Sequence, residues 1–243
     1  MADRAVLDRI ESTAGAAELR AESYRLLDLR AGATVVDVGS GPGLAAAELN
    51  ALGFQVTGVD PDALALELAR ERAPEVTFSV GTSDALPLAD ASIDGYRAAR
   101  LFHLLADPGP TLAEARRVLR PGGRIVLVGH DYGFLALDAA DQDLTDVVLL
   151  GLESAWVSPR SGRSLRNLLI DHGFRDVETV VHTEVVTDFD VLADRLAAAA
   201  EAAVKACLIT TEDAGAWLAD QAERGRSGHF LAACPTFLAA GTR

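Results

Sequence analysis

A short apolar run that ends in a glycine-rich turn is the feature that most constrains this chain. Residues 35–38 contain three valines, which suit a buried strand of a parallel sheet. Gly39, Gly41 and Gly43 follow, and a helix is expected at once over residues 44–52. Side chains are therefore missing where the chain must turn tightly and where a ligand can lie against backbone amides.

The spacing of these glycines argues against a dinucleotide site. The dinucleotide pattern G-x-G-x-x-G would place its third glycine at the position of Leu44, whereas this chain reads D-x-G-x-G-x-G from Asp37. A carboxylate ahead of the turn repels phosphate but suits a ligand that carries an ammonium group. We therefore expect a nucleoside that bears an amino acid, with Asp37 among its contacts.

Composition narrows the classes of partner. A net charge of −14 over 243 residues argues against a nucleic-acid-binding surface, which needs clustered lysine and arginine. Two isolated cysteines are too few for a disulfide framework or a zinc site, and we predict no metal. The start of the chain lacks the apolar segment of a signal peptide, and no apolar run is long enough to span a membrane. We expect a cytoplasmic protein without membrane contact.

Strands and helices are predicted to alternate along the first half of the chain. The patterns predict strands over residues 54–60, 76–80, 93–98 and 124–129, helices over 61–72 and 111–119, and an N-terminal helical segment over 4–29. This alternation is typical of a doubly wound α/β fold with a mostly parallel sheet. Residues 133–157 read as mainly helical, and later strands are expected at 176–186 and near 229–238. Pro235 predicts a bulge or an edge position for the last strand.

Acidic residues fall where ligands bind in such a sheet, beyond the carboxyl ends of the strands. Asp60 ends the second strand, where a carboxylate can bind both hydroxyls of a ribose. Asp84 follows the third strand and can accept a hydrogen bond from the exocyclic amine of a purine. The alternatives are a helix N-cap for Asp60 and a turn residue for Asp84.

The chain resembles the class I S-adenosylmethionine-dependent methyltransferases, in the small-molecule group related to ubiquinone and menaquinone methyltransferases. The resemblance covers about residues 20–131. It is carried by VVDVGSGPG (35–43), VTGVD (56–60), GTSDALP (81–87), Ala-Asp-Pro (106–108) and EARRVLRPGG (114–123). It implies a single domain with a Rossmann-like, seven-stranded sheet. Its parts would be an N-terminal helical segment (1–30), a cofactor-binding half (31–131), a helical cap inserted after strand five (132–160) and the rest of the sheet (161–243).

The resemblance also implies roles for particular residues. Gly39, Gly41 and Gly43 would pass under the methionine and ribose of S-adenosylmethionine, and Asp60 would hold the ribose, with Pro61 near the adenine. Asp84 and the Ala85 amide would contact the adenine. Arg100 and His103 would lie near the methionine end. Many relatives read Gln-His-Leu where this chain has His103-Leu104-Leu105, so a histidine stands where glutamine is usual.

Aromatic residues and two polar groups complete the predicted site. Tyr132, Phe134 and Trp156 from the cap, with Tyr24 from the N-terminal helix, are expected around an apolar acceptor, although ordinary core packing is the alternative for each. His130 and Asp131, at the end of strand five, are the candidate general bases, followed by His103. A helix cap or a loop hydrogen bond is the competing role for His130.

The leading hypothesis is a methyltransferase that acts on O, N or C of a small apolar or aromatic metabolite and releases S-adenosylhomocysteine. Specialised, natural-product biosynthesis is the expected setting, and a monomer or homodimer the expected state. The alternative is a protein of this fold that binds the cofactor but catalyses a step such as cyclisation or decarboxylation.

Overall fold

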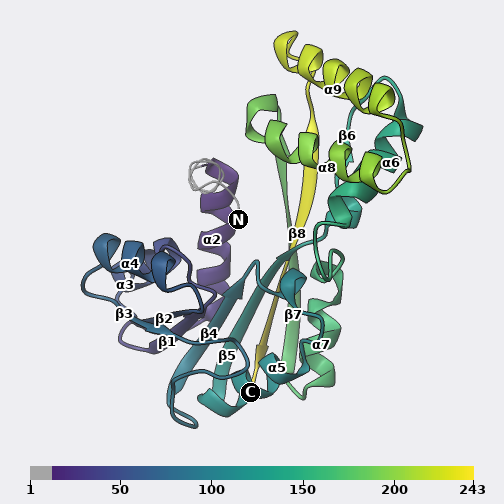
Figure 1. The fold of residues 1–243 in the computed structure, drawn as a ribbon. Coiled ribbons are helices and arrows are strands. Elements are labelled where there is room, and N and C mark those ends of the chain that lie inside the picture. Colours follow the sequence, from purple (N-terminus) through teal and green to yellow (C-terminus); the bar gives the residue numbers. More distant parts are fainter. Residues whose placement is uncertain (1–12) are drawn as a thin grey trace.

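A β-sheet with both parallel and antiparallel strands forms the centre of the molecule, and helices pack on its faces (Figure 1). The computed structural model describes residues 13–243. Five neighbouring strands are parallel, in the order β3-β2-β1-β4-β5. They are β1 (Thr34–Val38), β2 (Gln55–Asp60), β3 (Thr77–Val80), β4 (Ile93–Ala99) and β5 (Leu119–His130). The order reverses between β1 and β4, so the glycine-rich turn after β1 lies at the position where such sheets bind ligands.

The far side of the sheet is antiparallel and larger than expected. β8 (Ala232–Thr242) runs antiparallel between β5 and β7 (Arg175–Val186). A two-residue strand, β6 (Ala136–Leu137), pairs with the other end of β8 and makes eight strands instead of the predicted seven. The Arg120–Gly123 turn is also continuous with β5 rather than separate from it.

Pro235 lies inside the sheet, so the predicted edge position of the last strand is wrong. Along β8, Ala233 is the last residue opposite β6, and Thr236 is the first opposite β5. Pro235 therefore falls in the gap between these two pairings, while β7 covers the other side of β8. At this point neither β5 nor β6 needs a hydrogen bond from an amide that proline lacks.

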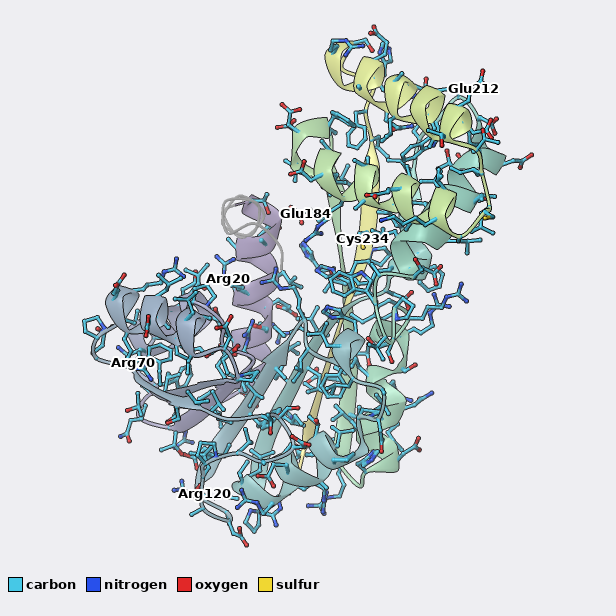
Figure 2. All side chains as sticks on the ribbon, in the orientation of Figure 1. Arg20, Arg70, Arg120, Glu184, Glu212 and Cys234 are labelled. Atoms are coloured by element: carbon cyan, nitrogen blue, oxygen red, sulfur yellow. The ribbon has the colours of Figure 1, made fainter. Side chains whose placement is uncertain are left out.

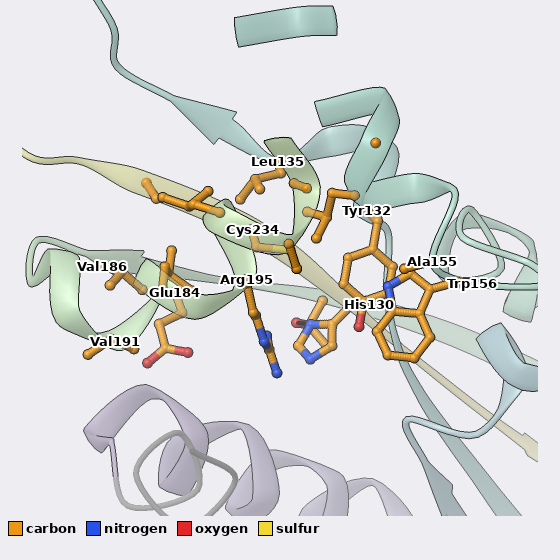
Figure 3. Close-up of a pocket in the computed structure, with 18 of the residues that line it drawn as sticks. His130, Tyr132, Leu135, Ala155, Trp156, Glu184, Val186, Val191, Arg195 and Cys234 are labelled. Atoms are coloured by element: carbon orange, nitrogen blue, oxygen red, sulfur yellow. Dashed lines mark hydrogen bonds between the residues drawn. The ribbon is translucent and has the colours of Figure 1, made fainter. Parts of the chain in front are cut away.

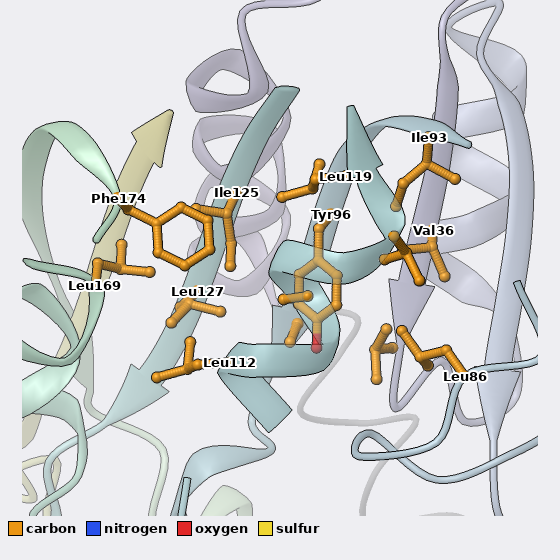
Figure 4. Packing of buried hydrophobic residues seen from close by; sticks show 14 of the residues in the cluster. Val36, Leu86, Ile93, Tyr96, Leu112, Leu119, Ile125, Leu127, Leu169 and Phe174 are labelled. Carbon is orange, nitrogen blue, oxygen red and sulfur yellow. The ribbon is translucent and has the colours of Figure 1, made fainter. Parts of the chain in front are cut away.

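Helices cover both faces of the sheet. On one face lie α2 (Ala14–Leu27), α3 (Leu44–Ala51) and α4 (Ala63–Arg72), and on the other α5 (Gly109–Val118) and α7 (Leu165–Asp171). Alternate residues of a strand serve the two layers: Ile125 and Leu127 pack with α5 and α7, as Figure 4 shows, whereas Val126 and Val128 pack with α2. The part of the predicted N-terminal helix that covers residues 4–12 lies outside the described residues.

A second, smaller helical layer, which we call the cap, stands beyond the carboxyl ends of the strands (Figure 1). It consists of α6 (Gln142–Glu153), α8 (Ala193–Lys205) and α9 (Thr211–Arg226). Gly151 of α6 lies so close to α8 that a Cβ there would be 2.2 Å from the carbonyl oxygen of Ala199. Leu152 and Leu196 share the cap's core with Trp217 of α9. Glu212 of α9 and Arg120 at the start of β5 mark opposite ends of the molecule (Figure 2).

The cap thus comes from two separate stretches of sequence, not from residues 132–160 alone. The segment 133–157 contributes one helix of 12 residues, preceded by β6 and by the short 3-10 helix η2 (Tyr132–Phe134). The 3-10 helices η3 (Gly162–Ser164) and η4 (Phe189–Val191) lead into α7 and α8. Helices α8 and α9, predicted with the C-terminal part of the sheet, pack on α6 because their apolar faces match it and not the sheet.

Candidate active site

The glycine-rich turn leaves its ligand-binding side open and its inner side packed. Gly39, Gly41 and Gly43 all have positive φ, at 72°, 49° and 77°, which glycine adopts without strain. A Cβ at Gly39 would meet only one atom, 3.9 Å away, and a Cβ at Gly41 would meet none within 4 Å. A Cβ at Gly43 would lie 2.8 Å from the Cβ of Ala69 in α4. Gly43 is therefore needed for helix packing, and the space for a ligand lies beside Gly39 and Gly41.

Asp60 ties the end of β2 to this turn. Its Oδ2 accepts a hydrogen bond from the Gly41 amide at 2.8 Å, and its Oδ1 accepts one from the Asp62 amide at 2.9 Å. The N-cap of α4 is Asp62, whose side chain accepts from the amides of Leu64 and Ala65, so the N-cap alternative for Asp60 is wrong. Each carboxylate oxygen of Asp60 keeps a second acceptor position for a ligand hydroxyl.

A cavity of about 350 Å³ lies beside the turn, at the carboxyl ends of β1 to β4. Gly39, Pro61 and Asp84 line it, together with Leu101 and Leu104 from the segment after β4. Asp84 is exposed and forms no hydrogen bond or ion pair with the described residues. The Ala85 amide instead donates to the Thr82 carbonyl at 3.2 Å, so its predicted contact with an adenine is not available in this conformation. The dimensions and lining fit a nucleoside.

Asp37 does not face this cavity. Its carboxylate is buried and accepts a hydrogen bond at 2.7 Å from Arg97 of β4, which also donates to the Ser23 hydroxyl of α2. Burial raises the pKa of Asp37, and the Arg97 charge opposes that rise. The expectation that Asp37 binds a ligand ammonium group is therefore wrong: the positive charge that it attracts is Arg97, and the pair fastens α2 to the sheet.

Arg100 and His103 follow β4, and neither is among the residues that line the cavity beside the turn. Arg100 has a positive φ of 54°, and its amide donates to the Val128 carbonyl of β5. His103 is buried in the 3-10 helix η1 (Phe102–Leu104), with its ring 4.5 Å from that of Trp156 and 5.8 Å from that of Tyr132. Burial, reinforced by the charges of Arg100 and Arg195, lowers the pKa of His103 to about 4.

A second cavity, of about 210 Å³, lies under the cap (Figure 3). Its walls are mostly apolar and come from α6, α8, β7 and β8. The polar lining comes from a few residues, two of them on β8. They are Thr13, His130, Glu184, Arg195, Cys234 and Thr236.

His130 points into the second cavity from the end of β5 (Figure 3). Its Nδ1 is 2.7 Å from the Thr236 hydroxyl of β8, and Nε2 has no partner among the described residues. Burial, together with the positive charges of Arg100 and Arg195, lowers the pKa of His130 to about 3. The ring is therefore neutral at neutral pH, and Nε2 can accept a hydrogen bond from a ligand when Nδ1 donates to Thr236.

Asp131 already has partners for both of its carboxylate oxygens. It is fully buried, and its two oxygens accept from Nε and Nη2 of Arg163 at 2.5 and 2.6 Å. It also caps η2 by accepting from the Gly133 amide. Both oxygens of Asp131 are thus engaged by Arg163 and by the η2 turn, which favours a structural role over the predicted catalytic one.

Two of the four predicted aromatic residues line the second cavity. Tyr132 and Trp156 stack with ring centroids 5.3 Å apart and form one wall. Phe134 is 50% exposed and lies under Arg163, outside the cavity. Tyr24 donates from its hydroxyl to Glu48 of α3 at 2.6 Å and packs between α2 and α3. Neither Phe134 nor Tyr24 therefore lines the cavity under the cap.

Sequence reasoning missed the residues that reach the site from the C-terminal half, chiefly Arg195, Cys234 and Thr236. One signal was present in α8. Arg195 stands three residues after Leu192 and four before Ala199, on the face that α8 presents to the cavity. A charged residue on the apolar face of a helix marks a possible binding position.

Comparison with known proteins supports the assignment of the first half. Residues 36–127 match the sequence profile of a methyltransferase domain. The chain contains a methyltransferase domain. The resemblance seen in the glycine-rich and later motifs is confirmed, and the sheet order agrees with the fold expected for it.

Relatives extend the similarity beyond this methyltransferase domain. The chain is 35% identical over 189 residues to an uncharacterised 37.1 kDa protein in transposon Tn4556 of Streptomyces fradiae, covering 75% of this chain and 55% of that protein. It is 33% identical over 160 residues to the O-methyltransferase resE of Aspergillus sclerotiorum, covering 63% and 58%. The chain thus spans little more than half the length of these curated relatives.

Solved structures of other proteins share the fold of this chain over most of its length. YcgJ from Bacillus subtilis superposes with a TM-score of 0.65 at 19% identity, covering 93% of this chain and 98% of that one. The [4+2]-cyclase SpnF superposes with a TM-score of 0.56 at 22% identity, covering 93% and 80%. Within residues 13–243, no helix is long and apolar enough to cross a bilayer, and no three histidine, cysteine or acidic side chains cluster as metal ligands would.

Proposed function

We propose that the chain is an S-adenosylmethionine-dependent methyltransferase that modifies O, N or C of a small apolar or aromatic metabolite in specialised biosynthesis in the cytoplasm. The observation that carries the proposal is the pair of cavities on either side of η1. Leu101 and Leu104 line the cavity beside the glycine-rich turn, and His103 contacts the aromatic wall of the cavity under the cap. A donor and an acceptor can therefore approach each other at the ends of β4 and β5.

The turn and Asp60 are suited to the donor. Gly39 and Gly41 offer bare backbone to a ligand, and Asp60 retains acceptor positions for ribose hydroxyls. Asp84, exposed on the cavity wall, would accept from the purine amine. S-adenosylmethionine, when bound, supplies a methyl group on a sulfonium with a good leaving group. The residues of this chain then need mainly to align the acceptor and to exclude water.

His130 is the histidine placed to take a proton from the acceptor where one must be lost, but its lowered pKa makes it a weak base unless a negative charge binds beside it. It faces the second cavity, and its bond to Thr236 can fix the tautomer with a free lone pair on Nε2. Tyr132 and Trp156 would orient a flat or apolar framework against their stacked rings. The two roles come from different elements, β5 and the cap, so cap packing would control their relative position.

Cyclisation or another non-methylating step is the second candidate. It is favoured by the structural likeness to SpnF, which is a cyclase, and by the leucine that replaces the customary histidine at position 104. An apolar cavity that aligns a substrate serves such a step as well as it serves methyl transfer.

Transfer of an isotopic label separates the two candidates. The purified chain would be incubated with methyl-labelled S-adenosylmethionine and a panel of aromatic phenols, acids and amines, and the organic-soluble products counted. Label in a product whose formation requires His130 supports methyl transfer. A product that forms without label supports the second candidate. An absence of both label and product across the panel, with no binding of the donor, contradicts both.

A further inference from the structure

Arg195 is the unusual residue of the cavity under the cap. Two other arginines near the site have carboxylate partners: the buried Arg97 pairs with Asp37, and the exposed Arg163 pairs with Asp131. Arg195 lines the cavity and is half-buried, yet it forms no hydrogen bond or ion pair with any other residue of the described range 13–243. An arginine removed from water without a partner lowers stability, so such a residue indicates that a ligand completes its contacts.

Glu184 does not neutralise Arg195, although both line the cavity. No ion pair joins the two side chains. The Glu184 carboxylate lies against the first turn of α2, where a Cβ built on Gly15 would be 2.8 Å from its Oε1 (Figure 2 shows Glu184 between α2 and the cap). That turn contains no acidic residue of its own, and the amino end of a helix carries partial positive charge. The Glu184 carboxylate therefore lies at the amino end of α2 and is not paired with Arg195.

The remaining polar groups around Arg195 are neutral or positive. The charges of Arg195 and Arg100 both act on His130, which is neutral. Burial raises the pKa of the Cys234 thiol to about 11, so this side chain is neutral as well. A positive site with an apolar surround results, and it lies within the same cavity as the stacked rings of Tyr132 and Trp156.

We propose that Arg195 binds an anionic oxygen of the acceptor, and that the acceptor is an apolar or aromatic acid. The inference rests on the proposed function in taking the cavity under the cap as the acceptor site. A carboxylate and an ionised phenol share the required chemistry. The apolar wall would contact the carbon framework of the acceptor. The Arg195 guanidinium would bind the anionic oxygen through its N–H groups, whose planar arrangement suits a carboxylate.

Calorimetric titration with matched aromatic probes tests the proposal. The probes are 2-naphthoate and its neutral counterpart 2-naphthamide, and 2-naphthol below and above the pH at which it ionises. We expect naphthoate or ionised naphthol to bind more tightly than the neutral counterpart. The Arg195→Gln variant should lose roughly 10- to 100-fold in affinity for the anion, and affinity for the neutral probe should stay unchanged. Arg195→Lys should recover part of the loss.

Arg166→Gln is the matched control, because Arg166 is exposed on α7 and does not line the cavity. It should bind every probe as the wild type does. Thermal melting of Arg195→Gln should show no loss of stability relative to the wild type, since the substitution removes an unpaired, half-buried charge and breaks no hydrogen bond or ion pair. Selective binding of naphthoate would assign a carboxylate, and selective binding of ionised naphthol would assign a phenolate.

Equal binding of charged and neutral probes, or an Arg195→Gln variant that keeps the selectivity, would overturn the proposal. The outcome is separable from that of the proposed function. Anion binding through Arg195 in a chain that fails to bind S-adenosylhomocysteine would support this inference and contradict the proposed function. Binding of S-adenosylhomocysteine without selectivity for the anion would do the reverse.

Discussion

Replacing Gly43 and Gly39 by alanine should separate the packing and the binding roles of the glycine-rich turn. Both residues have left-handed φ, and that conformation costs an alanine about 1–2 kcal/mol. Up to about 1 kcal/mol is recovered in either case, because alanine restricts the unfolded chain. Backbone strain therefore destabilises both variants by a similar, small amount.

The atoms around each glycine make the stabilities of the two variants differ. At Gly43 the new Cβ would be 2.8 Å from the Cβ and 3.1 Å from the Cα of Ala69, and 2.9 Å from Phe78. The Cα belongs to the backbone of α4 and cannot rotate away, so overpacking adds about 1–3 kcal/mol. At Gly39 the nearest atom is 3.9 Å away, and no such cost arises. We expect Gly43→Ala to be the less stable variant by about 1–3 kcal/mol.

Urea unfolding followed by circular dichroism measures the difference, with calorimetric titration of S-adenosylhomocysteine on each folded variant. Gly39→Ala should be nearly as stable as the wild type but bind the ligand more weakly, because its methyl group projects beside the cavity. Gly43→Ala should show the opposite pattern. Equal losses of stability, or a greater loss for Gly39→Ala, would refute the division of roles.

Two further predictions concern buried charge. The pKa of His130, about 3, lies below the unfolded value of 6.5, so only the unfolded chain takes up this proton as the pH falls through that interval. The free energy of unfolding should therefore fall between pH 6.5 and pH 4, and it should fall less steeply in a His130→Gln variant. Urea midpoints at several pH values measure both curves, and parallel curves for the two proteins would contradict the lowered pKa of His130. Arg97→Met should lower the free energy of unfolding by about 3–5 kcal/mol, because it leaves the buried Asp37 carboxylate without a partner. Adding Asp37→Asn to this variant should restore part of the lost stability. If Arg97→Met alone were as stable in urea as the wild type, the ion pair would not be buried as described.

The first half of the fold could be read from sequence because its signals are local. The valine run, the turn glycines and Asp60 lie close together in the chain, and the strand order brings them to one edge of the sheet. Asp37 shows the limit of such local reading. Its partner Arg97 belongs to β4, and no pattern within the motif indicates that a neighbouring strand supplies the compensating charge.

The acceptor side was harder to predict because it is assembled from distant segments. The cap joins α6 to helices α8 and α9, which follow it in sequence only after α7 and β7. Tyr132 and Trp156 were found because they flank α6, whereas Arg195 comes from α8 and Thr236 from β8. The prediction for Asp131 failed for a related reason. Its position after β5 suggests catalysis, but its carboxylate pairs with Arg163, which lies 32 residues further along the chain.

Calorimetric titration with S-adenosylhomocysteine tests the central claim most directly, namely that the turn and Asp60 form a nucleoside site. The wild type should bind. Asp60→Asn, which keeps one acceptor for the turn but loses the charge, should bind roughly 10- to 100-fold more weakly. Glu67→Ala, which removes an exposed acid from the neighbouring helix α4, should bind as the wild type does. Absence of binding by the wild type, or equal binding by Asp60→Asn, would contradict the account.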